Sequence, residues 1–338
     1  MLLTKVSIHT ITHIEAPIRV TSAEISARLS QTLKRVRMRE NFLETITGVQ
    51  ERRFWQGNQT PSEVATLVAA KVIEKSGLSK NDIGAIISTS ITKDFIEPSI
   101  ACIIHGNLKM SPECMNFDLG NACLGFLNGI HVAASMIESG QMDHVLVVAG
   151  ESFFDMVEAT LQRLEQETAT IQDVRDQLAT LTLGSGAVAM IISRTNLAPS
   201  GHPIRGLVTL SATEHNRVCC GWPDRVITDA PRLLEAGLDL SLKTCQKAQA
   251  ELGWHPSQFD EFAIHQISKT HTNMFLKLLN TESNKVMSTF TEYGNMGPVS
   301  APFTVSKLET DGRLVAGKRI SLMGIGSGIN GMIMDVQW

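Results

Sequence analysis

The chain has 338 residues, of which 43% are hydrophobic and 19% are charged, and its formal net charge is −4. This is enough apolar sequence for one large core or two smaller fused ones, and it excludes a chain that is disordered over most of its length. No Lys/Arg cluster is dense enough for a nucleic-acid surface, and no apolar run approaches the length of a membrane span. We therefore expect a soluble, cytoplasmic protein with no nucleic-acid partner, no membrane span, free cysteines and no metal site.

The N-terminal segment alternates like a β-strand, and further strands and helices follow it. Five later runs are short, aliphatic and bounded by Gly, Ser or Asp, as buried strands are: 83–89, 144–149, 187–193, 262–267 and 319–323. Helical patterns cover 62–76, 124–139 and 233–252. Strands that alternate with helices predict an α/β fold with mainly parallel pairing.

The chain also repeats three short motifs in the same order. Residues 79–82 resemble 257–260, residues 119–121 resemble 293–295, and residues 183–187 resemble 325–329. We infer two related halves, 1–197 and 198–338, joined at the linker-like sequence Ala198-Pro199-Ser200-Gly201 and packed about a pseudo-twofold axis. The charged helical segment at about 152–181 has no counterpart in the second half and is interpreted as an insertion.

The repeat places three reactive side chains on equivalent ends of the two halves. Cys123 begins a predicted helix, His265 lies at the end of a predicted strand, and Asn295 lies in a Gly-Asn turn. A helix N-terminus lowers the pKa of a thiol, and the small residues Gly120 and Gly125 leave room for a substrate. Taken singly, these residues also fit a buried apolar thiol, a core histidine and a turn asparagine. Their convergence favours nucleophilic catalysis.

A Cys–His–Asn set in this chain order fits two enzyme classes. Papain-like cysteine proteases carry their cysteine in a CGSCW-like segment near the mature N-terminus, which differs from NACLGF here. The thiolase superfamily of condensing enzymes is much more similar. The resemblance covers six segments. DLGNACLGFLNGI resembles the superfamily's nucleophile segment, FAIHQISKTH its histidine segment and TEYGNMGPVSAP its asparagine segment. LTLGSGAVAMII and LMGIGSGING resemble its two glycine-rich turns, and TGVQERRFW resembles an early element.

This resemblance implies a duplicated fold in α-β-α-β-α layers, a homodimer, and an acyltransferase that needs no cofactor besides its coenzyme A thioester substrate. Cys123 would take an acyl group from one thioester, while His265 and Asn295 would stabilise the enolate of a second. The backbone N–H groups of Cys123 and of Ser327 or Gly328 would form the oxyanion hole for acyl transfer.

The resemblance also suggests which segments contact the acyl chain. The insertion at 152–181 would cap the site or line an acyl tunnel, and residues 219–222 would place two free thiols near a lid. The expected substrate contacts are Gly125, Phe126 and Trp222.

Two features narrow the assignment within the superfamily. Degradative thiolases carry a second cysteine in the C-terminal glycine-rich turn, and this chain has none there. The 3-oxoacyl-[acyl-carrier-protein] synthase III group is more similar, but its HQAN motif is His265-Gln266-Ile267-Ser268 here, and Ile46 replaces an arginine that contacts coenzyme A.

Glu97 stands where synthase III usually has an apolar tunnel residue. A malonyl donor forms its carbanion by losing CO₂, whereas a simple acyl thioester must lose an α-proton to a general base. A desolvated carboxylate has a raised pKa and is a stronger base. Glu97 therefore resembles the glutamate of OleA-type enzymes, which join two fatty acyl-CoA molecules head to head, and it would act across the dimer interface.

Two other functions remain open on the sequence. One is decarboxylating synthase III chemistry with malonyl-acyl carrier protein, in which case Glu97 is an ordinary surface loop residue. The other is a non-enzymatic thiolase-like scaffold that binds acyl chains.

Overall fold

The strands of the two halves join in one sheet, and the strand order of each half, counted outward from the centre of the sheet, corresponds to that of the other. The computed structural model describes residues 1–338. The first half contributes β1 (Val6–Glu15), β4 (Ala85–Ser88), β5 (Met115–Asp118), β6 (His144–Glu151) and β7 (Gly186–Arg194), and the second contributes β8 (His202–Ser211), β11 (Glu261–Ile264), β12 (Arg319–Gly326) and β13 (Asn330–Gln337). The sheet order is β11-β12-β13-β8-β1-β7-β6-β4-β5. Outward from the short β1–β8 pairing, β7-β6-β4 on one side corresponds to β13-β12-β11 on the other, as a duplicated chain requires.

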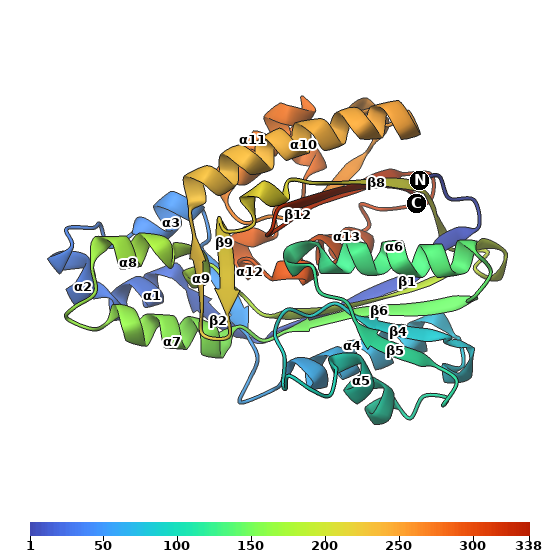
Figure 1. Cartoon of the computed structure of the whole chain (residues 1–338), viewed down its shortest axis with the longest axis horizontal. Helices are drawn as coiled ribbons and strands as arrows, with labels where there is room; N and C mark the ends of the chain where they lie inside the picture. The colour runs from blue at the N-terminus through green and yellow to red at the C-terminus, as the bar shows by residue number, and fades with distance from the viewer.

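Helices cover both faces of each half-sheet (Figure 1). The central layer consists of α6 (Gly125–Glu138) and α13 (Ser300–Thr310), which contact strands of both halves. The outer layers are α4 (Pro61–Ser76) with α5 (Ile100–Leu108) on one side, and α10 (Ala230–Leu252) with α11 (Lys269–Leu279) on the other. The largest apolar cluster lies around α6 and α13. The five layers agree with the predicted α-β-α-β-α arrangement.

The prediction of mainly parallel pairing is wrong. Only β4–β5, β4–β6 and β11–β12 pair in parallel, whereas β1–β7, β6–β7, β12–β13, β13–β8 and β1–β8 are antiparallel. The reason is that helices bury both faces of each half-sheet. A strand in such a sheet is a continuous apolar run whichever way it points, so its composition does not reveal its direction.

Local signals explain where individual elements begin and end. Thr60 and Glu63 form a capping box at the start of α4, Pro61 occupies its first turn, and Gly77 ends it with φ +71°. The predicted boundary between the halves lies in the connection from β7 to β8, at the end of the 3₁₀ turn Thr195–Leu197. The strand predicted at 262–267 ends at Ile264, so His265 follows the strand directly.

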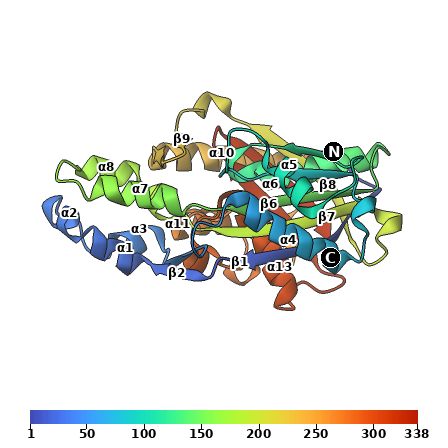
Figure 2. The same cartoon turned by 90° about the horizontal axis from the view of Figure 1, so that it is seen from below.

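A helical arm projects from one end of the layered body (Figures 1 and 2). It is built by α1 (Ser22–Arg28), α2 (Ser30–Arg35) and α3 (Phe42–Thr47), together with α7 (Phe154–Leu164), α8 (Ile171–Asp176) and α9 (Leu178–Leu181) of the predicted insertion. The arm has its own apolar cluster, and Arg28 of α1 pairs with Glu158 of α7. The two-stranded sheet of β2 (Ile18–Thr21) and β3 (Glu51–Phe54) connects it to the body. None of the helices combines the length and apolar character that a membrane span requires.

Candidate active site

Cys123 lies on a sharp turn between β5 and α6. The turn is the 3₁₀ segment Ala122–Leu124, and α6 begins only at Gly125. Ala122 has φ +45°, an uncommon conformation for a residue with a side chain. Such backbone strain is typical of functional sites, because the surrounding structure must hold it in place. The turn leaves Cys123 partly accessible to solvent while Leu124 on its far side enters the core.

The electrostatic environment of Cys123 differs from the expectation of an acidic thiol. Burial, with smaller contributions from Cys219 and Glu151, raises the pKa of Cys123 to about 12. The prediction that the helix N-terminus lowers this pKa is therefore wrong, because desolvation in the closely packed turn outweighs it. At neutral pH the thiol is protonated and must lose its proton as it attacks a substrate.

His265 lies one strand away from the segment that packs against the Cys123 turn. Its backbone N–H donates to the carbonyl of Met323 on β12 at 2.9 Å. The next residue, Gly324, packs so closely on Leu124 that an added Cβ would lie 2.8 Å from the Leu124 Cδ1. Burial lowers the pKa of His265 to about 3, and its Nδ1 has no hydrogen-bond partner within the chain. A neutral imidazole with a free nitrogen can exchange a hydrogen bond or a proton with a substrate.

Asn295 is held by backbone pairing with the first glycine-rich turn. Its N–H donates to the Thr182 carbonyl at 2.8 Å, and its carbonyl accepts from the Gly184 N–H at 3.0 Å. Its side-chain oxygen accepts from the Gly297 N–H at 3.0 Å. The 3₁₀ turn Gly297–Val299 that follows contacts the Cys123 turn. The amide group of Asn295 thus has a fixed orientation near the nucleophile.

The second glycine-rich turn passes against the other side of the Cys123 turn. A Cβ on Gly326 would lie 2.9 Å from the Asn121 carbonyl oxygen and 3.2 Å from the Leu124 nitrogen. Ser327 and Gly328 follow in the connection to β13, and Gly328 has φ +122°. The predicted oxyanion-hole donors therefore belong to two turns in van der Waals contact. Which N–H groups bind a substrate oxygen stays a prediction.

Two of the predicted substrate contacts have a simpler explanation in packing. Gly125 is buried, and a Cβ on it would lie 3.1 Å from the Thr89 carbonyl oxygen, so its small size allows α6 to approach the end of β4. Phe126 is fully buried in the central apolar cluster. Packing therefore accounts for both residues, and their contact with a substrate stays a prediction.

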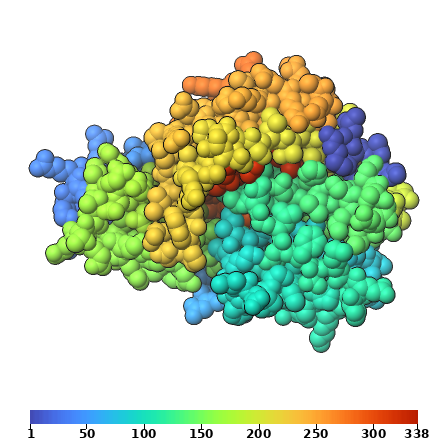
Figure 3. Space-filling view, viewed as in Figure 1, coloured from blue at the N-terminus to red at the C-terminus, as the bar shows by residue number.

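Trp222, the third predicted contact, lies on a hairpin formed by β9 (Cys219–Trp222) and β10 (Arg225–Thr228). Its side chain is 43% exposed, and the Arg225 guanidinium lies over the ring at 5.1 Å. Cys219 and Cys220 are free thiols, as predicted. Figure 3 shows a hollow on this face of the molecule, with the C-terminal segment in red on its floor and the yellow segment leading to the hairpin beside it.

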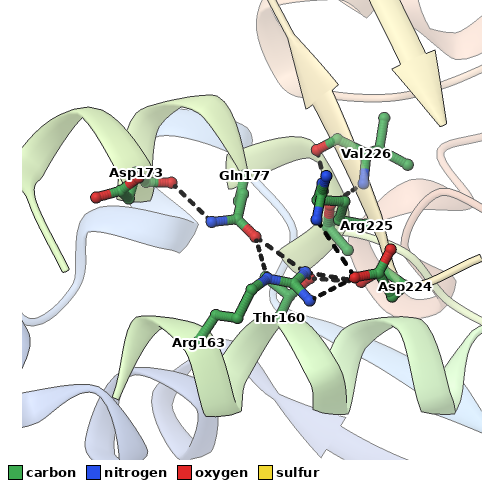
Figure 4. Close-up of polar contacts among 8 residues, drawn as sticks. Thr160, Arg163, Asp173, Gln177, Asp224, Arg225 and Val226 are labelled. Atoms are coloured by element: carbon green, nitrogen blue, oxygen red, sulfur yellow. Dashed lines mark hydrogen bonds and ion pairs between the residues drawn. The ribbon is translucent and has the colours of Figure 1, made fainter. Parts of the chain in front are cut away.

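A polar network fastens this hairpin to the predicted insertion (Figure 4). Arg163 of α7 donates to the Asp224 carboxylate at 2.9 Å and to the Asp224 carbonyl at 2.7 Å. The same guanidinium donates to Gln177 at 3.1 Å, and the Thr180 hydroxyl bonds both backbone groups of Val226. The insertion of the first half and the hairpin of the second half therefore form one layer beside the hollow.

Glu97 lies apart from these residues within the single chain. It is exposed, on the loop 89–99 that connects β4 to α5, and it directly follows the fully exposed Ile96. The desolvated environment expected for a general base is therefore absent from the isolated chain.

Sequence reasoning missed two titratable groups near the site. His271 lies in the first turn of α11 and is partly buried, with a buried Nδ1 that has no hydrogen-bond partner. It influences His265 electrostatically, and burial lowers the pKa of His271 to about 4. Glu151 is fully buried at the end of β6 and accepts hydrogen bonds from Ile91 and Thr92. The available signal for Glu151 was an acidic residue that ends the otherwise uncharged, largely apolar run HVLVVAGE.

Comparisons with known proteins agree with this arrangement. Residues 117–209 match the family model of 3-oxoacyl-[acyl-carrier-protein] synthase III, and residues 249–338 match the model of its C-terminal part. A beta-ketoacyl-[acyl-carrier-protein] synthase III from Rickettsia akari is 25% identical over 90% of this chain and 93% of its own. Two proteins named acyl-CoA:acyl-CoA alkyltransferase are more similar. The one from Xanthomonas campestris pv. campestris is 43% identical over the whole of both chains, and the one from Shewanella oneidensis is 34% identical over 99% of each.

Solved structures of the Xanthomonas campestris protein, OleA, have the same fold. The form with bound cerulenin superimposes with a TM-score of 0.98, covering 100% of this chain and 98% of that one. Other solved forms carry single substitutions of a glutamate, a cysteine or a histidine, and these three residues have the same spacing in their chain as Glu97, Cys123 and His265 have here. By full-length identity and fold, this chain belongs to the acyl-CoA:acyl-CoA alkyltransferase (OleA) family of the thiolase superfamily.

Proposed function

We propose that this protein condenses two fatty acyl-CoA molecules head to head without decarboxylation. The observation that carries the proposal is the arrangement of Cys123, His265 and Asn295 on segments that meet around one turn. The names of the Xanthomonas and Shewanella relatives describe the same class of reaction. The product would be a 2-alkyl-3-oxoacyl thioester, a precursor of long-chain olefins or ketones.

The first half-reaction acylates Cys123. The thiol is protonated at neutral pH, so it attacks the thioester as its proton passes to a neutral acceptor, and His265 has a free ring nitrogen for this role. Backbone N–H groups of Cys123 and of the turn at Ser327 and Gly328 stabilise the oxyanion, and coenzyme A leaves as its thiol, taking up the proton that His265 accepted.

The second half-reaction forms the carbon–carbon bond. A second acyl-CoA loses an α-proton to Glu97 of the partner subunit, and the enolate oxygen is stabilised by His265 and Asn295. The enolate carbon then attacks the acyl-Cys123 carbonyl, and the Cys123 sulfur leaves and regains a proton from the protonated Glu97, which restores both groups. Since a simple acyl thioester carries no carboxylate to lose, this step requires a base, which malonyl-dependent synthases do not need.

Two features of the single chain support the role of a second copy. Glu97 is solvent-exposed, so it becomes a desolvated base only if an interface covers it. The edge strand β5 presents unpaired backbone groups, and the exposed apolar residues Met115, Phe95 and Ile96 lie on it and on the neighbouring loop. A homodimer that pairs these edges would cover the patch and bring Glu97 to the partner's Cys123.

The direct test supplies the purified protein with one long-chain acyl-CoA and no malonyl donor. We expect sustained release of free coenzyme A and, by mass spectrometry, a two-chain β-keto product. Glu97→Ala should give a single burst of about one thiol per site and no product, while the exposed Glu113→Ala control behaves like wild type. If wild type itself stops after the burst and resumes on addition of malonyl-acyl carrier protein, the enzyme is a decarboxylating synthase and the proposal is wrong.

A complementation experiment tests whether Glu97 acts in the partner's site. Cys123→Ala and Glu97→Ala chains are each expected to be inactive. Unfolded together and refolded, they should recover about a quarter of wild-type turnover, because half of the dimers are mixed and each mixed dimer has one complete site. If Glu97 acts within its own chain, every mixed site lacks one residue and no activity returns.

A further inference from the structure

Glu151 is a buried carboxylate at the end of a central strand. All eight residues of β6 are buried, and Glu151 is its only acidic residue. Placing a carboxylate there is costly unless its oxygens are hydrogen-bonded. Burial raises the pKa of Glu151 to about 7. A glutamine or an apolar residue would avoid this cost, so the position calls for an explanation.

The carboxylate is used to hold the root of the loop that carries Glu97. One oxygen accepts from the Ile91 N–H at 2.6 Å, and the other accepts from the Thr92 N–H at 3.0 Å and the Thr92 hydroxyl at 2.6 Å. The Thr92 hydroxyl oxygen also accepts from the Ser152 N–H at 3.1 Å. Two further carboxylates fix the loop farther on: Asp94 accepts from the Ser62 N–H, and Asp118 pairs with Lys93.

This anchoring ends before the tip of the loop. Ile96 and Glu97 are exposed, with no hydrogen bond from either side chain. The position of Glu97 relative to the body of the protein is therefore set from both sides, by the anchored segment that precedes it and by α5, whose Ile100 and Ala101 N–H groups donate to Asp118. Glu151 is the most deeply buried of the anchors of the segment that precedes Glu97.

The same anchor reaches the Asn295 segment. The side chain of Ile91 packs on Gly297, where an added Cβ would lie 3.1 Å from the Ile91 Cδ1. Gly297 has φ +57°, and its N–H donates to the side-chain oxygen of Asn295. A shift of Ile91 would therefore disturb the residue that orients the Asn295 amide.

We propose that Glu151 is a positioning residue for carbon–carbon bond formation, which sets the placement of Glu97 and, through Ile91 and Gly297, the orientation of Asn295. This inference rests on the proposed function, in which Glu97 is the base. Glu151 is not itself a catalytic group, because both of its oxygens are occupied by donors of the 89–99 loop.

The test uses Glu151→Gln, which keeps the shape but turns one acceptor into a donor facing Ile91 or Thr92. We expect the burst that reports Cys123 acylation to keep its rate and size, the KM for acyl-CoA to stay near the wild-type value, and condensation turnover to fall about 100-fold, as for a misplacement near 1 Å. The matched control is Asp335→Asn, which removes a buried carboxylate of β13 that pairs with Arg319 of β12. It should lower stability without this selective loss.

A double-mutant cycle separates positioning of the base from a general structural effect. In the Glu97→Asp background, where the shortened carboxylate is already displaced, Glu151→Gln should reduce the remaining condensation by much less than 100-fold, because the placement that Glu151 secures is already lost. An equally large further loss, or a parallel loss of acylation and condensation, would overturn the proposal.

Two arms keep the result interpretable. If Glu151→Gln fails to fold, Thr92→Val is used in its place, because it removes one hydrogen bond to the same carboxylate. We expect a smaller selective loss of condensation, about tenfold. An unchanged condensation rate in a folded Thr92→Val protein then counts against the proposal. Failure of wild type to condense acyl-CoA would instead refute the proposed function, independently of the variants.

Discussion

Of the glycines in the chain, Gly184 has the least room for a side chain, because it packs against the segment that carries Asn295. This packing supports a quantitative prediction. A Cβ on Gly184 would clash with the Tyr293 carbonyl oxygen and would lie 3.1 Å from the Arg52 Cβ. The clashing atom is backbone, so it cannot rotate away. The clash can be relieved only if the segment that carries Asn295 moves. This movement stretches the two backbone hydrogen bonds of Asn295 with Thr182 and Gly184.

The magnitude follows from these contacts. Overpacking costs about 1–3 kcal/mol and the two weakened hydrogen bonds about 1 kcal/mol each. Gly184→Ala should therefore lower the free energy of unfolding by about 3–5 kcal/mol, which corresponds to a fall in Tm of roughly 4–7 °C for a chain of this size. Because the displaced segment holds the Asn295 amide, condensation should decrease more than acylation.

The assay combines thermal unfolding with the burst and steady-state measurements of coenzyme A release. The control is Gly106→Ala, an exposed position in α5 where an added Cβ meets nothing within 4 Å. It should be neutral or stabilise the protein by about 0.5–1 kcal/mol. If Gly184→Ala changes neither Tm nor condensation, the two halves do not pack as tightly as described and the fixed orientation of Asn295 is not supported.

Three further predictions concern titration and the hairpin. Burial raises the pKa of Cys123 to about 12, so alkylation of its thiol by iodoacetamide should accelerate about tenfold per pH unit between about pH 7 and pH 9. Peptide mass spectrometry measures this alkylation, and a rate that levels off in this pH range would contradict the raised pKa. Burial lowers the pKa of His271 to about 4, so below about pH 6.5 the unfolded chain binds a proton that the folded chain does not, and the free energy of unfolding should fall as the pH drops toward 4. His271→Gln should reduce this loss by about 3 kcal/mol in denaturant titrations, and an unchanged pH dependence would show that this histidine is not responsible. Arg163→Met should increase hydrogen exchange in residues 219–228 while α6 keeps its protection, and equal protection in both proteins would mean that the network with Asp224 does not hold the hairpin.

Local features could be predicted from the sequence alone wherever one short segment contains all the residues that determine the feature. The capping box at Thr60 and Glu63 with Gly77 predicts α4 to within one residue of its observed start. The repeated glycine-rich motifs predict the duplication, because only small residues allow turns of the two halves to pack against each other. The resemblance of the segments around Cys123, His265 and Asn295 indicates the family, since each motif combines a reactive residue with the backbone turn that presents it.

Properties that depend on distant segments required the folded chain. Strand direction was mispredicted because burial on both faces gives the same apolar pattern for either direction. The pKa of Cys123 depends on the packing around its turn, and desolvation there opposes the helix N-terminus that the local sequence suggests. Glu151 gains its role only from Ile91 and Thr92, which lie about 60 residues earlier in the chain. The sequence pattern describes each segment separately, whereas desolvation and hydrogen bonding are set by whichever segments the fold brings together.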